Sequence, residues 1–200
     1  MTKDAKDLFE NKVFQHFLFN SLNSVASLCR TDPEAAAELV IEISTFLQKS
    51  LEKKPPLITL AEELEQAASY VSIQKARFAN RLEILFEIEE EVECLLPPFT
   101  LQPLIDNAVI HGVLKRRPGG IVLLSVQSTP QGVHFKITDN GVGMNSDQLA
   151  LLLDSCNNVH SLFQIDYKLK ANGFNGLTIS SVKNRGTEVS FTISSHVYPA

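Results

Sequence analysis

The stretch LQPLIDNAVIHG, from Leu101 to Gly112, is the segment on which the fold prediction depends most. Its pattern predicts a helix from about Thr100 to Gly112, in which Asn107 and His111 are four residues apart and therefore share a face. A carboxamide oxygen that a helix directs into a cleft suits Mg²⁺, which accepts one or two protein oxygens together with phosphates and waters. Taken alone, the stretch fits a partly buried helix with a structural Asn and His at least as well.

A second stretch, DNGVGM at Asp139–Met144, follows a segment with the alternating pattern of a strand. Glycines at this point let the backbone approach a ligand closely, and a carboxylate at a strand end can accept a hydrogen bond from an exocyclic amine. The pattern is weak in isolation, because Asn-Gly turns end many strands. It is not followed by a helix in the GxGxxG pattern, which excludes a Rossmann dinucleotide site.

The chain before these two stretches has the pattern of helices, the first predicted from Asp4 to about Arg30. The apolar side of this helix includes Phe17, Leu18 and Leu22. Its polar side carries Lys12, His16, Asn20, Asn23, Ser27 and Arg30. His16 is therefore expected to face solvent, where a neutral imidazole can act as a nucleophile. From this helix alone, an ordinary surface histidine is the favoured interpretation.

Two further helices are predicted before residue 80. Asp32 is expected to cap the second helix, with Pro33 at its first position. The third helix begins with a capping box, in which Thr59 and Glu62 satisfy each other's backbone amides. Its apolar face is predicted to consist of Leu64, Ala68, Val71 and Phe78.

Near Asn80 the period of the apolar residues changes from 3.6 to 2, beginning with a predicted strand at Leu82–Ile88. Further strands are expected at about 121–128, 133–139, 177–182 and 187–194, with short helices near 148–153 and 162–169. Helices first and a mixed α/β region second predict an α+β chain. The expected domains are a helical region at 1–80 and an α/β domain at 81–200.

The composition narrows the class of protein. Hydrophobic residues make up 44% and charged residues 20%, as in ordinary globular domains, and a net charge of −5 argues against binding nucleic acid over a broad basic face. Cys29, Cys94 and Cys156 contain no CxxC pair, so neither a disulfide framework nor a thiolate zinc site is predicted. No apolar run approaches the roughly 20 residues of a membrane span, and the first residues lack a signal-peptide core. A cytoplasmic location is expected.

Taken together and in this order, the motifs resemble those of the sensor histidine kinases of the LytS type. That family has an NPHFLFN phosphoacceptor motif, a helix with an RF pair, an LQPLVENAxxHG N-box and a DNGxGM G1 box. The counterparts here are His16–Asn20, Arg77-Phe78, Leu101–Gly112 and Asp139–Met144, and Gly186-Thr187 matches the family's terminal GT. The resemblance covers nearly the whole chain.

The resemblance implies a helical dimerisation and phosphoacceptor region, followed by an ATPase domain of the Bergerat type with a mixed sheet under helices. It implies an ATP-dependent protein histidine kinase that acts as a homodimer, phosphorylates His16 and passes the phosphoryl group to an aspartate of a response-regulator receiver domain. Asn107 would then be the Mg²⁺ ligand, and Asp139 would bind the adenine amine of ATP. The other residues implied at the nucleotide are His111, Gly141, Gly143, Gly186 and Thr187. Family members usually carry a sensor upstream, so a membrane is expected to be reached only through a segment outside this chain, which would then be the cytoplasmic portion of a membrane-anchored sensor.

The sequence departs from the family at three points. Phe14-Gln15 replaces the Asn-Pro before the histidine, and Asp106 stands where Glu is usual, which keeps the carboxylate. The G2 box, GxGLxNVxxRL, is best matched by Ser155–Leu162, which keeps the Asn-Val pair but contains no glycine. Side chains there would obstruct the bare backbone amides that the box offers to a triphosphate. An alternative function is therefore a kinase-like dimeric interaction or scaffold module with weak or absent activity. A nucleotide hydrolase of the same superfamily is disfavoured, because Pro103 occupies the position of its general-base Glu.

Overall fold

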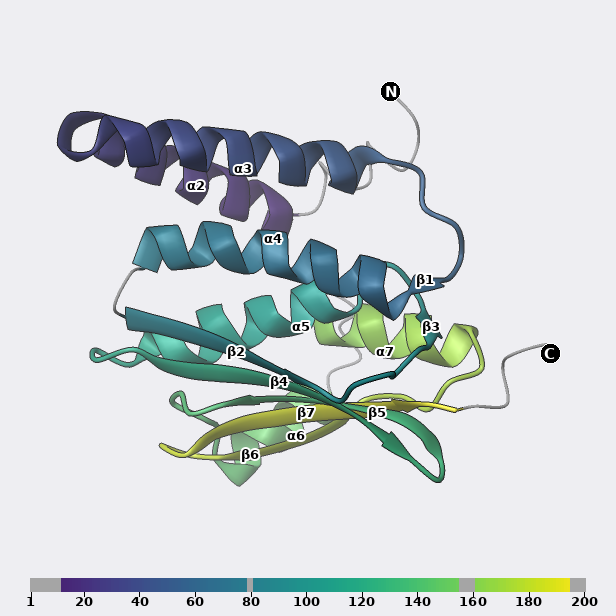
Figure 1. The fold of residues 1–200 in the computed structure, drawn as a ribbon. Coiled ribbons are helices and arrows are strands. Elements are labelled where there is room, and N and C mark those ends of the chain that lie inside the picture. The colour runs from purple at the N-terminus through teal and green to yellow at the C-terminus, as the bar shows by residue number, and fades with distance from the viewer. Residues whose placement is uncertain (1–11, 79–80, 155–160, 195–200) are drawn as a thin grey trace. The chain divides into compact units, whose positions relative to one another are not determined.

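The computed structural model describes residues 12–78, 81–154 and 161–194, which divide into two compact units (Figure 1). Unit 1 is drawn from Met1–Pro55 and Ala68–Ala79, and unit 2 from Pro56–Ala67 and Asn80–Ala200. The helix α4 (Leu60–Phe78) therefore contributes its first part to unit 2 and the remainder to unit 1. A boundary between functional domains at residue 80 stays a prediction.

Unit 1 is helical. The helices α2 (Lys12–Thr31) and α3 (Pro33–Leu51) are neighbours joined at Asp32, whose carboxylate accepts a 3.1 Å hydrogen bond from the amide of Ala35, as the sequence predicts (Figure 1). The core is aromatic: the ring of Phe17 lies 5.2 Å from that of Phe46 and 5.4 Å from that of Tyr70. Edge-on and tilted ring contacts of this kind stabilise a small helical core beyond the area that they bury.

The apolar face predicted for the first helix is partly wrong. Leu22 is 49% exposed, whereas Ser21 is fully buried. The hydroxyl of Ser21 donates to the carbonyl oxygen of Phe17 at 2.8 Å, and this bond within the helix allows a polar side chain to lie in the core.

Unit 2 is built on a mixed five-stranded sheet with the strand order β2-β4-β5-β7-β6. The bounds are β2 (Leu82–Ile88), β4 (Gly120–Thr129), β5 (Gly132–Asp139), β6 (Thr178–Val182) and β7 (Gly186–Ile193). The β2–β4 pair is parallel and the other pairs are antiparallel. A parallel pair needs a long crossover, and here the chain between β2 and β4 forms the helical segments from Leu101 to Lys115. A separate pair joins β1 (Ile58–Thr59) to β3 (Leu95–Leu96).

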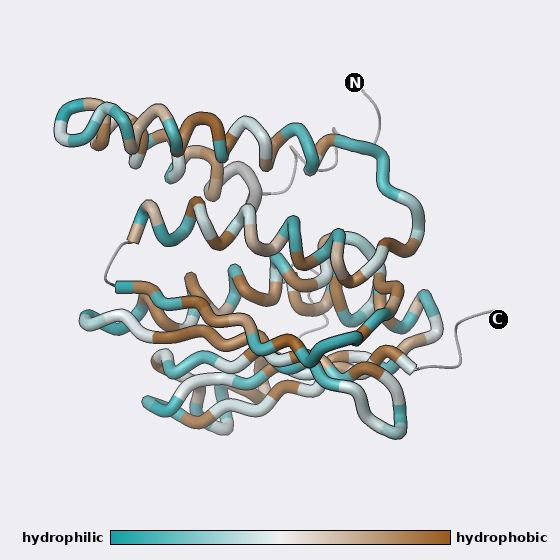
Figure 2. The backbone as a smooth tube through the Cα atoms, viewed as in Figure 1, coloured by the Kyte–Doolittle hydropathy of each residue, from teal (hydrophilic) through white to brown (hydrophobic). Residues whose placement is uncertain are grey.

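Helices α5 (Leu101–Asn107) and α7 (Ser161–Ala171) lie along one face of this sheet, and α6 (Ser146–Asp154) follows β5 (Figure 1). Apolar residues are concentrated in the central strands and in α5 (Figure 2). In the middle of the sheet, the rings of Phe135 and Phe191 stack at 4.6 Å between paired positions of β5 and β7. The core of unit 2 therefore lies between the sheet and the helices that border the site.

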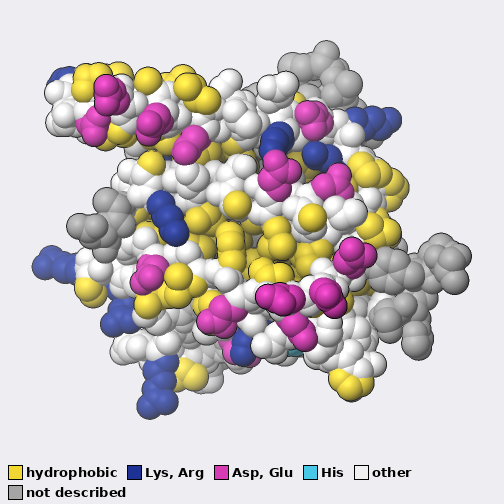
Figure 3. Space-filling model, in the orientation of Figure 1, with side chains coloured by type: hydrophobic (Ala, Val, Ile, Leu, Met, Phe, Trp, Pro, Cys, Tyr) yellow, Lys and Arg dark blue, Asp and Glu magenta, His cyan; other side chains and the backbone are white. Residues whose placement is uncertain are grey.

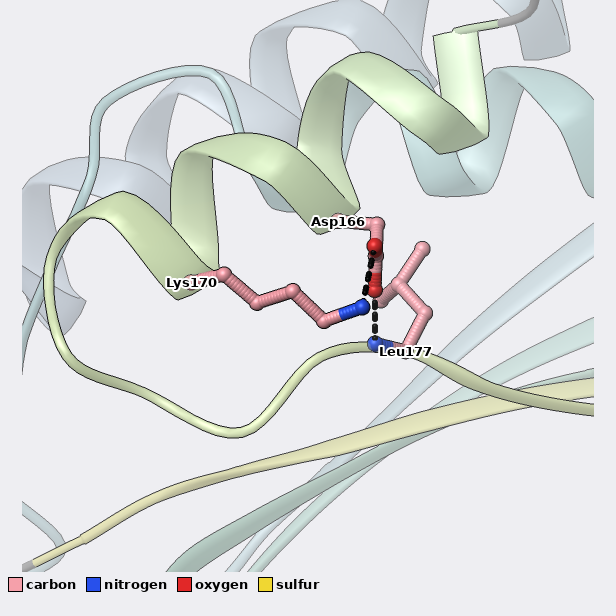
Figure 4. A network of polar contacts seen from close by, with 3 residues as sticks. All are labelled: Asp166, Lys170 and Leu177. Carbon is pink, nitrogen blue, oxygen red and sulfur yellow. Dashed lines mark hydrogen bonds and ion pairs between the residues drawn. The ribbon is translucent and has the colours of Figure 1, made fainter. Parts of the chain in front are cut away.

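The return of the chain from α7 to β6 is fixed by Asp166. Its carboxylate accepts a 2.8 Å hydrogen bond from the amide of Leu177 and pairs with Lys170 at 2.7 Å (Figure 4). This contact ties α7 to the segment that leads into the sheet.

The predicted α+β fold is confirmed, with a helical region followed by a mixed sheet under helices. The helix predicted from Thr100 to Gly112 is confirmed in extent, but it is not a regular α-helix throughout, because α5 ends at Asn107. Ala108–Gly112 forms the π-helix η2, and Val113–Lys115 forms a 3₁₀ turn, η3. Wider turns of this kind are found often at functional sites. In the described ranges, no helix is long and apolar enough to span a bilayer.

The capping box of α4 is confirmed, but its buried face differs from the prediction. Glu62 accepts a 2.8 Å hydrogen bond from the amide of Thr59, and the hydroxyl of Thr59 accepts from the amide of Glu62 at 3.2 Å. Ala68, predicted to face the core, is exposed. The buried positions of α4 instead include three polar residues, Glu63, Gln66 and Gln74.

Candidate functional site

Unit 2 contains a cavity of about 220 Å³ between the α5–η2 segment and the strands β5 and β7. Its walls are mainly apolar, formed by Leu104, Ile137, Met144, Leu152, Leu162 and Val189. Four polar side chains also line it: Asn107, His111, Asp139 and Thr187. An apolar cavity with few polar groups is the usual form of a small-molecule site.

Asp139, the last residue of β5, is the buried acceptor of this cavity, with 4% of its surface exposed. Its Oδ1 accepts a 2.7 Å hydrogen bond from the amide of Gly141. Burial raises the pKa of Asp139, and hydrogen bonds from the backbone amides of Gly141 and Thr187 partly oppose that rise. The site thus offers a carboxylate that is held by the backbone and is available to an exocyclic amine.

Asn107 lies at the end of α5, on the cavity wall. Its Nδ2 donates to the carbonyl oxygen of Pro103 at 2.7 Å and to the Oγ of Ser161 at 2.6 Å. Both hydrogen bonds use the amide nitrogen, so the carboxamide oxygen is the atom that a cation would bind. In the part of the chain that the structure describes, no three His, Cys, Asp or Glu side chains gather as a metal site. One amide oxygen together with ligand phosphates and waters suits Mg²⁺, which seldom takes an all-protein cage.

The glycines of the two motifs bring their backbones into contact. A Cβ atom on Gly112 would lie 2.5 Å from Oδ1 of Asp139, and one on Gly141 would overlap the backbone of Gly112. Gly186 has a φ of +114°, and a side chain there would overlap the carbonyl group of Asp139. Gly143 lines the cavity itself. The end of the N-box segment and the DNG turn therefore pack together only because these positions lack side chains.

The structure thus brings together most of the residues predicted from the sequence. Five of them line one cavity: Asn107, His111, Asp139, Gly143 and Thr187. Gly141 donates its amide to the carboxylate of Asp139, and Gly186 packs against the carbonyl group of Asp139. His16 lies in α2 of unit 1, but its side chain is outside what the structure describes. The proposed G2 residues 155–160, His160 among them, and His196 lie outside the described residues as well, whereas Ser161 and Leu162 begin α7.

Three residues near the site were missed by sequence reasoning. Ser161 bonds Asn107, and Glu63 and Lys168 meet the start of α5 from other helices. Ser161 lies in the stretch matched to the G2 box, but its contact with Asn107 is not foreseen from that match. Glu63 and Lys168 belong to no local motif, and only the buried face of α4 carries a signal, since a charged residue rarely lies on a buried face without a partner.

Comparison with known proteins identifies the family. A model for histidine kinases matches residues 7–82. The chain is 36% identical to the sensor protein LytS of Bacillus cereus over 91% of its own length and 32% of that protein. It is 38% identical to YwpD of Bacillus subtilis, covering 96% of this chain and 70% of YwpD. The chain belongs to the LytS-type sensor histidine kinases.

The fold of this LytS-type kinase chain agrees with that of solved histidine kinases. The histidine kinase domain of the Erythrobacter litoralis EL346 blue-light activated kinase matches 92% of it with a TM-score of 0.53 at 13% identity, and 86% of that domain is covered. At this identity the likeness concerns the fold alone. The chain spans about a third of the length of LytS, so it corresponds to one part of such a sensor. Membership confirms the resemblance inferred from the motifs and places the chain in the two-component signalling family.

Proposed function

We propose that this chain is the catalytic core of a two-component sensor kinase, which binds ATP with Mg²⁺ in the cavity of unit 2 and autophosphorylates on His16. The phosphoryl group then passes to an aspartate of a response-regulator receiver domain. The observation that carries the proposal is that Asn107 and Asp139, separate in sequence, line a single apolar cavity. These two residues supply what an adenine nucleotide and its cation require.

The roles of the residues follow from their chemistry. Asp139 accepts the hydrogen bond of the adenine amine, and the apolar walls at Ile137 and Met144 enclose the ring. When bound, Mg²⁺ would be held by the Asn107 oxygen and would offset charge on the phosphates. Phosphoryl transfer requires little covalent work from the protein beyond placing the nucleophile in line, and a helix-mounted imidazole meets that need.

A homodimer is proposed from the apolar surface of unit 1. Phe19 and Leu22 of α2 are 67% and 49% exposed, and Ile41 of α3 is 66% exposed. Hydrophobic side chains lie along the outer surface of α3 (Figure 3). A second copy related by a two-fold axis would bury these side chains in a four-helix arrangement. A cytoplasmic location, with any membrane contact through a sensor segment outside this chain, belongs to the same proposal.

The proposed phosphoacceptor is tested with γ-labelled ATP and Mg²⁺. Wild type is expected to take up acid-labile label, and His16→Gln to take up none. His134→Gln is the matched control, because His134 lies half-buried on β5, where its Nδ1 contacts Thr192 Oγ1 at 3.1 Å, outside the cavity. Full labelling of His16→Gln would contradict the assignment. No label in any of the three proteins, despite nucleotide binding, would favour the interaction module instead.

The proposed cavity is tested separately by calorimetry. Asp139→Asn is expected to lose at least tenfold in ATP affinity, because the carboxylate is replaced by an amide whose NH₂ group faces the amine of adenine. GTP provides the control, since its ring carries a carbonyl oxygen where adenine carries the amine. Unchanged ATP affinity in Asp139→Asn would contradict the placement of adenine.

A further inference from the structure

Glu63 lies on the buried face of α4, outside the cavity, with none of its surface exposed. Its carboxylate accepts hydrogen bonds from three successive backbone amides, those of Phe99 at 3.0 Å, Thr100 at 2.5 Å and Leu101 at 2.7 Å. The amides of Thr100 and Leu101 lie at the start of α5, where they have no partner within the helix, and Phe99 directly precedes its N-cap. Thr100, at the N-cap position, uses its hydroxyl to donate to the carbonyl of Pro97. The start of α5 therefore depends on a side chain 36 to 38 residues away.

Lys168 of α7 completes this arrangement. Its Nζ donates to the carbonyl oxygen of Pro98 at 2.9 Å, and its charge interacts with that of Glu63. Burial lowers the pKa of Lys168 and raises that of Glu63, and each charge opposes the shift of the other. A buried carboxylate with three amide donors and a nearby cation is satisfied as a group, and removal of either charge leaves the other uncompensated.

The two ends of α5 are thus fixed by different contacts. Glu63 and Lys168 hold its first residues, while Ser161 at the start of α7 bonds Asn107 at its last. The helix between them is only Leu101–Asn107, so a change at its start reaches Asn107 within two turns. In contrast, Asp139 is held by β5 and by the amides of Gly141 and Thr187, which do not involve α5.

We propose that Glu63 is a positioning residue for the nucleotide site: it fixes the start of α5 and thereby aims the Asn107 oxygen at the cation of bound Mg–ATP. This inference rests on the proposed function. Loss of the Glu63 carboxylate disturbs the cation side of the cavity and leaves the adenine side intact. Because α4 continues from unit 2 into unit 1, Glu63 also joins the cavity wall to the helix that leads into the unit that contains His16.

The test compares Glu63→Gln with Glu62→Gln by calorimetry. Gln keeps the size of Glu63 but replaces one acceptor oxygen with an NH₂ group that opposes the α5 amides. Glu62 is the matched control, because it caps α4 at Thr59 rather than α5. Glu63→Gln is expected to weaken Mg–ATP binding about tenfold, as the loss of a residue that orients a metal ligand does. It is expected to change the affinity for metal-free ADP less than twofold. Glu62→Gln should leave both affinities within twofold.

The outcomes separate the inference from the function on which it rests. Wild-type affinity of Glu63→Gln for Mg–ATP would overturn the positioning role, and so would an equal loss for Mg–ATP and metal-free ADP. If wild type binds no nucleotide, the proposed function fails, and hydrogen exchange decides whether Glu63 positions α5. Loss of protection at residues 99–107 in Glu63→Gln but not in Glu62→Gln supports the inference. Unchanged protection at these residues in Glu63→Gln overturns it. If Glu63→Gln does not fold, Lys168→Met, which removes the Pro98 contact, must reproduce the Mg–ATP effect for the inference to stand.

Discussion

Glu62 and Glu63 are neighbours in the sequence and both cap a helix, yet they do so in opposite ways. Glu62 is exposed and bonds Thr59, three residues earlier, at the start of its own helix. Glu63 is fully buried and bonds the amides of Phe99–Leu101, at the start of a different helix. The first contact belongs to secondary structure and the second to tertiary structure.

The difference in burial decides how much each carboxylate contributes to stability. A local cap competes with water for its amides, so its net contribution is modest, typically about 1 kcal/mol. A buried cap has replaced water altogether, and its amides cannot be rehydrated without opening the core. A change at Glu62 should therefore alter the stability of the α4 start only slightly, whereas the start of α5, and with it the wall of the cavity, depends on the buried Glu63 and its neighbour Lys168.

The largest expected effect is that of Glu63→Ala. The substitution leaves three amides and the Lys168 charge without their partner, so the free energy of unfolding should fall by about 3–5 kcal/mol. Urea unfolding followed by circular dichroism measures the loss. The double variant Glu63→Ala/Lys168→Met should be less destabilised than the sum of its two single variants, because it removes the stranded charge as well. A loss below about 1 kcal/mol would show that Glu63 is no more than a second local cap.

A smaller effect is expected for Glu62→Ala, which should lower stability by about 1 kcal/mol and loosen the first turn of α4. The amide of Leu60 in that turn donates to the carbonyl of Cys94 at 2.9 Å. Burial raises the pKa of the Cys94 thiol to about 12, so the thiol reacts only when this region opens. Alkylation measured by mass spectrometry should therefore be faster at Cys94 in the variant and unchanged at the exposed Cys29. Equal Cys94 rates would contradict local loosening.

The smallest stability effect is expected for Asp139→Asn, a buried carboxylate that serves a ligand rather than a helix. Burial raises its pKa in the folded state above the ordinary value of 3.8, so the folded protein holds this proton more tightly than the unfolded chain. Wild-type stability from this group is therefore lost as pH rises from about 3.8 through the raised pKa. The melting temperature of Asp139→Asn relative to wild type should rise across that interval and level off above it. A variant clearly less stable than wild type at pH 7 would give Asp139 a structural role like that of Glu63.

What the sequence predicts well is what is encoded over a few residues. The cap at Asp32, the Thr59–Glu62 box and the strand at Leu82–Ile88 depend on neighbours along the chain, and the structure contains each of them. The predicted alternation of the strand holds for its first residues and breaks at Phe86, which is exposed. The family resemblance assigns Asn107 and Asp139 to one nucleotide site; both residues line the same cavity, and their roles there stay a prediction. The strands of the five-stranded sheet are predicted as well, whereas the π-helix at the site and the buried polar side chains of α2 and α4 are not.

Three features show why. The π-helix at Ala108–Gly112 ends at Gly112, which packs closely against Asp139 of a distant segment. Ser21 is buried because Phe17 satisfies it, which a hydropathy pattern assigns to the wrong face. Glu63 follows a local capping motif that already explains one glutamate, so its neighbour looks like an ordinary surface charge. In each case the contact is one that the periodicity of apolar residues does not encode.

The contact between Glu63 and the start of α5 decides which fragments of this chain can be expected to fold. A fragment beginning at residue 81 would contain every strand of the five-stranded sheet and the whole cavity lining, yet it would lack Glu63 and Ile58, which pairs with Leu96. One beginning at Pro56 would retain the capping carboxylate and the small β1–β3 pair. The ability of unit 2 to fold alone therefore depends on the segment before its first long strand, and tests of nucleotide binding by an isolated unit 2 should use a fragment that starts upstream of α4.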